Sequence, residues 1–112
     1  MDITFAKKGL EQQANDLGLC IRKMGEKRAK IYQQRLGALR AARTLEDVRF
    51  MPGHFHELVE DRKGQWSCNL DQPYRLIFEP QEDPIPTNGD GSFIWNEIVA
   101  VRIVEVVDYH GG

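Results

Sequence analysis

Apolar residues in the first half of the chain recur at helical spacing. One stripe, with steps of four, three, four and three residues, consists of Leu10, Ala14, Leu17, Ile21 and Met24. Because Gly18 and Gly25 interrupt this stripe, we expect a first helix over residues 7–17 and a break before the next one.

A second and stronger helix is predicted over residues 25–42. Its apolar line is formed by Tyr32, Leu36 and Leu39, and basic side chains occupy its other faces. A short strand fits residues 2–5, which contain β-branched and aromatic side chains. Thr44 followed by two acids predicts a helical turn over 45–49.

The second half changes to the alternation of β-strands. One predicted strand places Trp66, Cys68 and Leu70 on one face and Gln65, Ser67 and Asn69 on the other. The next places Tyr74, Leu76 and Phe78 on one face and Arg75, Ile77 and Glu79 on the other. Such alternation is typical of an antiparallel sheet with one buried face.

These patterns predict the order β-α-α-β-β-β-β. The four later strands are expected at 54–59, 65–70, 74–79 and 98–109, with turns at 60–64 and 71–73 and a long loop at 80–92. The order is typical of an α+β fold with helices packed on one face of a mainly antiparallel sheet. A length of 112 residues suits a single domain over 1–112.

Composition narrows the class of protein. Apolar residues make up 41% and charged residues 29% of the chain, which is an ordinary soluble mixture. No apolar stretch approaches the ~18 residues of a membrane helix, and the N-terminus lacks a signal-peptide pattern. Cys20 and Cys68 are too few for a disulfide framework and have no zinc spacing. We expect a soluble, cytoplasmic protein.

Charge is distributed unevenly although the net charge is only −2. Residues 22–43 hold eight basic groups and one acid, and residues 79–97 hold five acids and no base. The basic stretch is compatible with a polyanionic partner, but charge alone favours the alternative of a solvated helix face.

The three histidines are the main candidates for chemistry. His54 and His56 share a strand face, and His110 directly follows Asp108 and Tyr109. Imidazole exchanges protons near neutral pH, and a tyrosine can donate a hydrogen bond or stack on a base. The alternative is a polar chain end without function. The histidines lack a carboxylate that would complete a metal site, so we predict no metal and no cofactor.

Two further features could contact an anion. Arg62 and Lys63 lie at a predicted turn and Trp66 begins the next strand, so they could contact phosphates and stack a base. The alternative is a solvated turn beside a core tryptophan. Arg75 lies within an apolar strand and either pairs with an acid such as Glu79 or binds an anion.

Taken together, three segments resemble the HigB-type toxins, also called plasmid-maintenance killer proteins, of the RelE/ParE superfamily of toxin–antitoxin systems. The segments are PGHFHELVEDRKGQWS, YRLIFEP and VRIVEVVDYHG. The resemblance covers residues 51–80 and 99–111, and it covers the N-terminal half only through the order of elements.

The resemblance implies a curved sheet with N-terminal helices against it. It also implies a metal-independent endoribonuclease that cleaves mRNA in the ribosomal A site and is neutralised by an antitoxin with a helix-turn-helix region. The family's catalytic residues match His56, Arg75, Asp108, Tyr109 and His110 of this chain. His54 has no clear family counterpart.

RNA cleavage of this kind needs a base for the 2′-OH, a cation for the phosphate and an acid for the 5′-oxygen. We expect His56 and His110 to share proton transfer and Arg75 to stabilise the phosphate, while Tyr109 contacts the nucleotide and Asp108 orients a partner. Two alternatives stay open: a ParE-type toxin that acts on DNA gyrase, and an inactive relic that only binds its antitoxin. The slightly acidic chain and its acidic loop depart from the family's commonly basic character.

Overall fold

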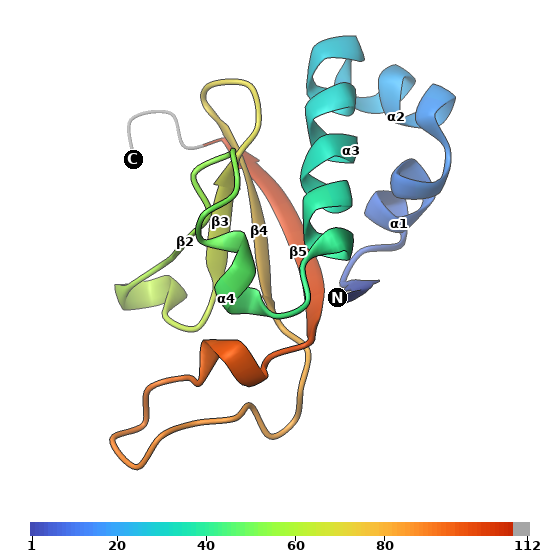
Figure 1. The fold of residues 1–112 in the computed structure, drawn as a ribbon. Helices are drawn as coiled ribbons and strands as arrows, with labels where there is room; N and C mark the ends of the chain where they lie inside the picture. Colours follow the sequence, from blue (N-terminus) through green and yellow to red (C-terminus); the bar gives the residue numbers. More distant parts are fainter. Residues whose placement is uncertain (109–112) are drawn as a thin grey trace.

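The computed structural model describes residues 1–108 and shows helices beside a five-stranded sheet (Figure 1). The helices are α1 (Lys8–Asn15), α2 (Leu17–Met24), α3 (Glu26–Ala41) and α4 (Leu45–Val48). The strands are β1 (Asp2–Phe5), β2 (His56–Glu57), β3 (Trp66–Asn69), β4 (Tyr74–Pro80) and β5 (Ala100–Asp108). Two short 3₁₀ helices, η1 (Glu60–Arg62) and η2 (Trp95–Glu97), lie in the connections.

The predicted α+β fold is confirmed. The strand order is β1-β5-β4-β3-β2, in which β1 runs parallel to β5 and every other neighbour is antiparallel. The apolar strand predicted at 98–109 is β5, an interior strand between β1 and β4. Helices α1 to α3 stand together on one side of the sheet (Figure 1).

The first helical region differs from the prediction. The expected helix over 7–17 ends at Asn15, and α2 follows as a separate helix. Asp16 ends the first helix in an extended conformation, and its carboxylate accepts a hydrogen bond of 3.0 Å from the backbone nitrogen of Leu19. This cap starts α2, so the break falls at Asp16 and Gly18 lies inside the second helix.

The buried face of the sheet follows the predicted alternation. Trp66, Leu76 and Phe78 are fully buried there and belong to one hydrophobic core with Tyr32, Leu36 and Leu39 of α3. The Tyr32 hydroxyl donates 2.9 Å to the carbonyl of Leu10, which ties α3 to α1.

The strand predicted at 54–59 is reduced to the two residues of β2. His54 has a φ of 54°, which is outside the extended region. Phe55 turns into the core and is 3% exposed. The chain therefore reaches the sheet edge through a tight bend, and only His56 and Glu57 pair with β3.

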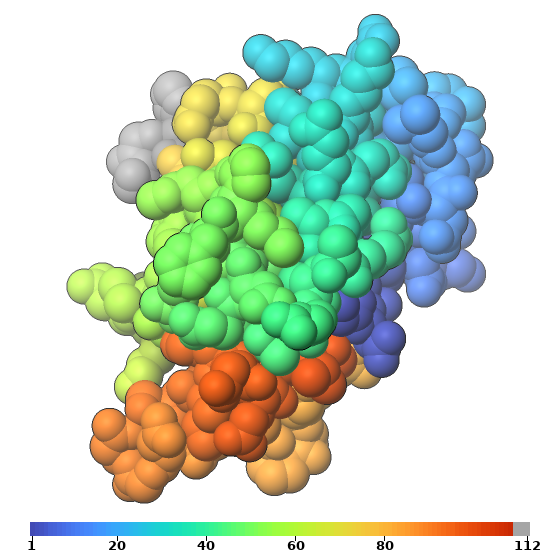
Figure 2. Space-filling view, viewed as in Figure 1, coloured from blue at the N-terminus to red at the C-terminus, as the bar shows by residue number. Residues whose placement is uncertain are grey.

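The long acidic loop joins β4 to β5 and extends beyond the end of the sheet (Figure 1). In Figure 2 it forms the orange, lower part of the molecule and lies against the green segment. Its base is fixed by aromatic packing, because the ring of Trp95 lies 5.0 Å from that of Trp66 and 5.2 Å from that of Phe93. The loop is therefore attached to the core beside β3.

Candidate active site

The face of the sheet that points away from α3, here called the outer face, carries the polar residues of β3 and β4. Cross-strand pairs place Ser67 beside Ile77 and Asn69 beside Arg75. Directly paired residues point to the same face of an antiparallel sheet, so this face matches the predicted grouping. Ser67 and Ile77 are nevertheless buried on this face.

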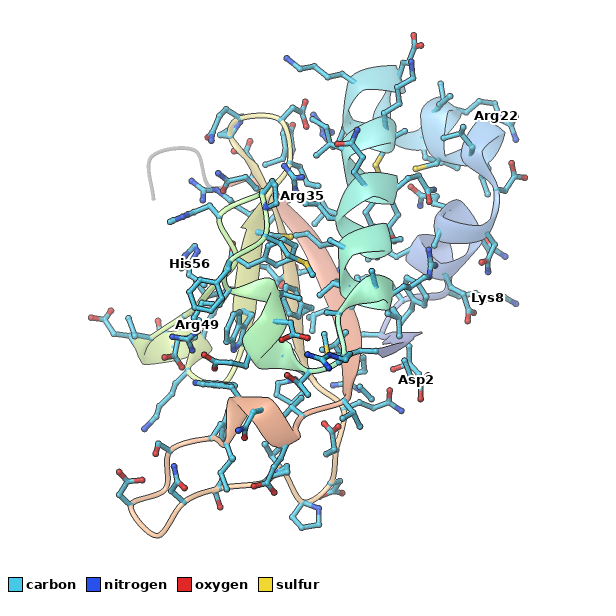
Figure 3. The ribbon with its side chains drawn as sticks, in the orientation of Figure 1. Asp2, Lys8, Arg22, Arg35, Arg49 and His56 are labelled. Atoms are coloured by element: carbon cyan, nitrogen blue, oxygen red, sulfur yellow. The ribbon has the colours of Figure 1, made fainter. Side chains whose placement is uncertain are left out.

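His56 and Arg75 share a small cavity on the outer face. The cavity measures about 190 Å³ and is lined by His56, Leu58, Ser67 and Arg75. His56 comes from β2, Ser67 lies opposite it on β3, and Arg75 comes from β4. Figure 3 shows His56 projecting away from α3. Three neighbouring strands thus bring an imidazole, a hydroxyl and a guanidinium together.

The ring of His56 is held in a defined tautomer. Its Nδ1 lies 3.0 Å from the carbonyl oxygen of His54. A carbonyl only accepts hydrogen bonds, so Nδ1 carries the proton and the Nε2 of a neutral ring is left as the acceptor. The ring of His54 lies 4.4 Å from that of His56 at an angle of 39°, which further restricts the position of the His56 ring.

Arg75 does not pair with Glu79, which answers one question left by the sequence. Its Nη1 donates a hydrogen bond of 2.5 Å to Oδ1 of Asn69. Glu79 instead accepts hydrogen bonds from Arg102 and from Gln65, the latter at 3.0 Å. The alternation had placed Ser67 and Asn69 on this face, but nothing in their residue types assigned them to the site.

The predicted phosphate-binding and base-stacking cluster of Arg62, Lys63 and Trp66 only partly matches the structure. Arg62 and Lys63 line an open cleft of about 630 Å³ with Phe93 of the acidic loop. Arg62 also forms a 2.9 Å ion pair with Glu105 of β5. Trp66 is fully buried and packs against Phe78, so its ring cannot stack on a base. The expectation for Trp66 is wrong because its strand face is the core face.

Of the three C-terminal candidates, Asp108, Tyr109 and His110, the structure describes only Asp108. Asp108 pairs with Tyr74, whereas Val107 pairs with Arg75. By this register Asp108 shares the face of Tyr74, and it does not line the cavity of His56 and Arg75. Tyr109 and His110 lie outside the described residues.

Two arginines of the basic segment 22–43 turn toward the sheet. Arg28 forms a 2.8 Å ion pair with Asp71 and stacks 3.4 Å over the ring of Tyr74. The Arg28 guanidinium holds the pKa of the Asp71 carboxyl below its usual range. Arg35 donates 2.7 Å to the backbone oxygen of Asn69. These two side chains therefore support the fold around the β3–β4 turn.

The cysteines are core residues. Burial raises the pKa of the Cys68 thiol to about 12 and also raises that of Cys20. Both side chains are fully buried, which is typical of structural rather than reactive cysteines. Within residues 1–108 no three metal-ligating side chains gather into one site. Over the same residues, no helix has the length and apolar character needed to cross a membrane.

Comparisons with known proteins agree with the resemblance found in the sequence. A model of the HigB-like toxin family, described as the RelE-like toxin HigB of type II toxin–antitoxin systems, matches residues 3–88. The match contains both His56 and Arg75 and extends over the N-terminal helices. A comparison with curated proteins gives no match. Because the family model covers well over half of the chain, the protein belongs to the HigB-like family of type II toxins.

Proposed function

We propose that this toxin is a ribosome-dependent endoribonuclease that cleaves mRNA in the ribosomal A site without a metal. The observation that carries the proposal is the shared cavity of His56 and Arg75 on the outer face. A proton-transfer group and a fixed cation beside each other are what phosphodiester cleavage requires. A purely binding surface has no need of this pairing.

The reaction starts at the ribose of the cleaved nucleotide. His56 Nε2 takes the proton of the 2′-OH, and the 2′-oxygen forms a bond to the adjacent phosphorus. The bond from phosphorus to the 5′-oxygen breaks, and an acid supplies a proton to that oxygen. The products are a 2′,3′-cyclic phosphate and a 5′-hydroxyl. The tautomer set by the His54 carbonyl supports His56 as the base, because its Nε2 lone pair is available.

Arg75 stabilises the negative charge that builds on the phosphate during this step. Its guanidinium is fixed by Asn69 at the edge of the cavity, and a preorganised cation loses little reorganisation energy in the reaction. His110 is then the acid, Tyr109 contacts the nucleotide, and Asp108 orients one of these groups. These three roles rest on the family resemblance.

Flanking RNA follows the cleft between η1 and the acidic loop. Arg62 and Lys63 line this cleft and are suited to contact phosphates. Arg62 is partly neutralised by Glu105, so Lys63 is the stronger candidate for this contact. An enzyme that acts on translating ribosomes works in the cytoplasm, and its partner is an antitoxin with a helix-turn-helix region.

A gyrase poison of ParE type has the same superfamily fold, and fold alone does not separate the two functions. The test is induced expression of the wild type and of His56→Gln in a bacterial host, with growth followed and mRNA 5′ ends mapped. We expect growth arrest with new in-frame mRNA ends for the wild type. Both effects should disappear in His56→Gln, since glutamine cannot accept the proton at neutral pH.

Gln13→Ala is a matched control, because Gln13 lies on α1, among the helices on the other side of the sheet, and should arrest growth like the wild type. Arrest without new mRNA ends would contradict cleavage and favour a gyrase-type mechanism. Absence of arrest with soluble wild-type protein would favour an inactive antitoxin-binding relic.

A further inference from the structure

Asn69, the last residue of β3, joins three parts of the molecule that meet at the cavity. Its backbone nitrogen donates 2.7 Å to the carbonyl of Gly53, in the loop that leads to His56. Its backbone oxygen accepts 2.7 Å from Nε of Arg35 on α3. Its side-chain Oδ1 accepts 2.5 Å from Nη1 of Arg75. One residue thus contacts the loop before the base, the helix layer and the cation.

The first two contacts hold Asn69 firmly in place. Gly53 approaches Arg35 so closely that an added Cβ would lie 2.6 Å from Nε of Arg35. Gly53 also has a φ of 119°, which side-chain-bearing residues rarely adopt. Figure 3 shows Arg35 reaching from α3 toward this loop. The loop, the arginine and the end of β3 therefore pack as one unit behind the cavity.

The third contact is the one that bears on function. Oδ1 of Asn69 meets one arm of the guanidinium, and the guanidinium lines the cavity together with His56. An amide oxygen accepts a hydrogen bond without contributing a formal negative charge. Asn69 can therefore direct Arg75 toward a phosphate without competing with that phosphate for its charge.

We propose that Asn69 is a positioning residue that sets the Arg75 guanidinium for the charge of the transition state. This inference rests on the proposed nuclease function and adds a residue to which the sequence pattern assigned no role. In the proposed reaction, Asn69 touches no reacting atom. It acts through Arg75, and its effect is expected on the rate of the chemical step rather than on binding to the ribosome.

The test uses purified toxin and ribosomes programmed with an mRNA that is cleaved once. The rate constant at saturating toxin and the toxin concentration that gives half of this rate are measured for the wild type, Asn69→Ala, Arg75→Ala and the double variant. Asn69→Ala removes Oδ1 but keeps both backbone contacts, so the fold should survive. Asn69→Ser, whose hydroxyl is too short to replace Oδ1, is the second variant if alanine is poorly soluble.

We expect Asn69→Ala to lower the saturating rate constant about tenfold, because small misplacements of a catalytic group slow reactions strongly. The half-saturating concentration should stay within about twofold, since binding is little changed. The double variant should be no slower than Arg75→Ala, because Asn69 has no effect once its target is gone. Gln33→Ala removes a side-chain amide that donates to Gln13, between α3 and α1, and should match the wild type.

Three outcomes would contradict the inference, and they are separable. If Arg75→Ala slows cleavage and Asn69→Ala does not, the proposed function stands and the role of Asn69 is wrong. If the two effects multiply in the double variant, Asn69 acts independently of Arg75 and is structural. If the wild type does not cleave, or Arg75→Ala cleaves like the wild type, the proposed function itself fails and this inference fails with it.

Discussion

Two regions of the outer face, the side toward β5 and the cavity of His56, hold their arginines with different kinds of partner. Arg62 pairs with Glu105 and Arg102 pairs with Glu79, so carboxylates hold both side chains. Near the cavity, the neutral amide of Asn69 holds Arg75. A carboxylate fixes an arginine and neutralises it, whereas an amide fixes the side chain and adds no charge.

Under the proposed function, this difference bears on how each arginine can interact with a substrate phosphate. A cation that is already paired offers little attraction to an RNA phosphate, because the nearby carboxylate repels the same phosphate. His56 lies in one cross-strand row with Ser67, Ile77 and Glu105, so the Arg62–Glu105 pair lies across the sheet from His56. Within the cavity of His56, the amide of Asn69 holds Arg75 and adds no negative charge.

Exchanging the two kinds of partner gives the largest expected effect. Asn69→Asp keeps an acceptor at the same position but places a carboxylate beside the substrate phosphate. We expect the saturating rate of mRNA cleavage to fall about tenfold or more at neutral pH. The measurement is single-turnover cleavage on programmed ribosomes.

The reciprocal variant Glu105→Gln is the matched control, since it makes the partner of Arg62 neutral. Its cleavage rate should remain within about threefold of the wild type. Equal losses for the two variants would show that the charge of the partner matters no more for Arg75 than for Arg62.

The close packing behind the cavity predicts the next effect, on stability. Gly53→Ala introduces a side chain at a φ of 119° and 2.6 Å from Nε of Arg35. We expect the free energy of unfolding to fall by about 2 kcal/mol, in the range of backbone strain of this kind. Urea denaturation measures the change. Gly89→Ala, where an added Cβ meets nothing within 4 Å, should change stability by less than about 1 kcal/mol.

The ion pair of Arg28 with Asp71 predicts a smaller, pH-dependent effect on the free energy of unfolding. Arg28 lowers the pKa of Asp71 in the folded chain, so the unfolded chain takes up the proton first as pH falls. The ion pair should contribute about 1 kcal/mol above pH 5 and lose this contribution below the ordinary aspartate pKa of about 4. Asp71→Asn should flatten this part of the stability curve. A curve as steep as that of the wild type would contradict the assignment.

Alternation was sufficient to predict the two faces of the sheet. Residues 65–70 and 74–79 separate into core and outer sets as the structure has them, and that separation places Ser67, Asn69 and Arg75 together. The same alternation places Trp66 with Cys68 and Leu70, which already argues for a core role. The expectation that Trp66 stacks on RNA followed from its residue type and neglected its face.

Other features depend on contacts that no local pattern reports. The link between Asn69 and Arg75 needs the register of β3 against β4, and the approach of Arg35 needs the position of α3 over Gly53. The start of α2 could have been predicted from the sequence, since Asp16 followed by an apolar stretch is a common helix cap. The prediction treated Gly18 as a helix breaker, but a glycine is tolerated inside a helix, and Gly18 lies within α2.

The position of β5 has a consequence for folding during synthesis on the ribosome. In the sheet of residues 1–108, β5 lies between β1 and β4, so these two strands are not joined until β5 is present. A nascent chain of which only the first eighty residues have left the ribosome can pair β2, β3 and β4 with one another, whereas β1 still lacks its neighbour β5. The complete sheet therefore forms only after β5 itself has been synthesised.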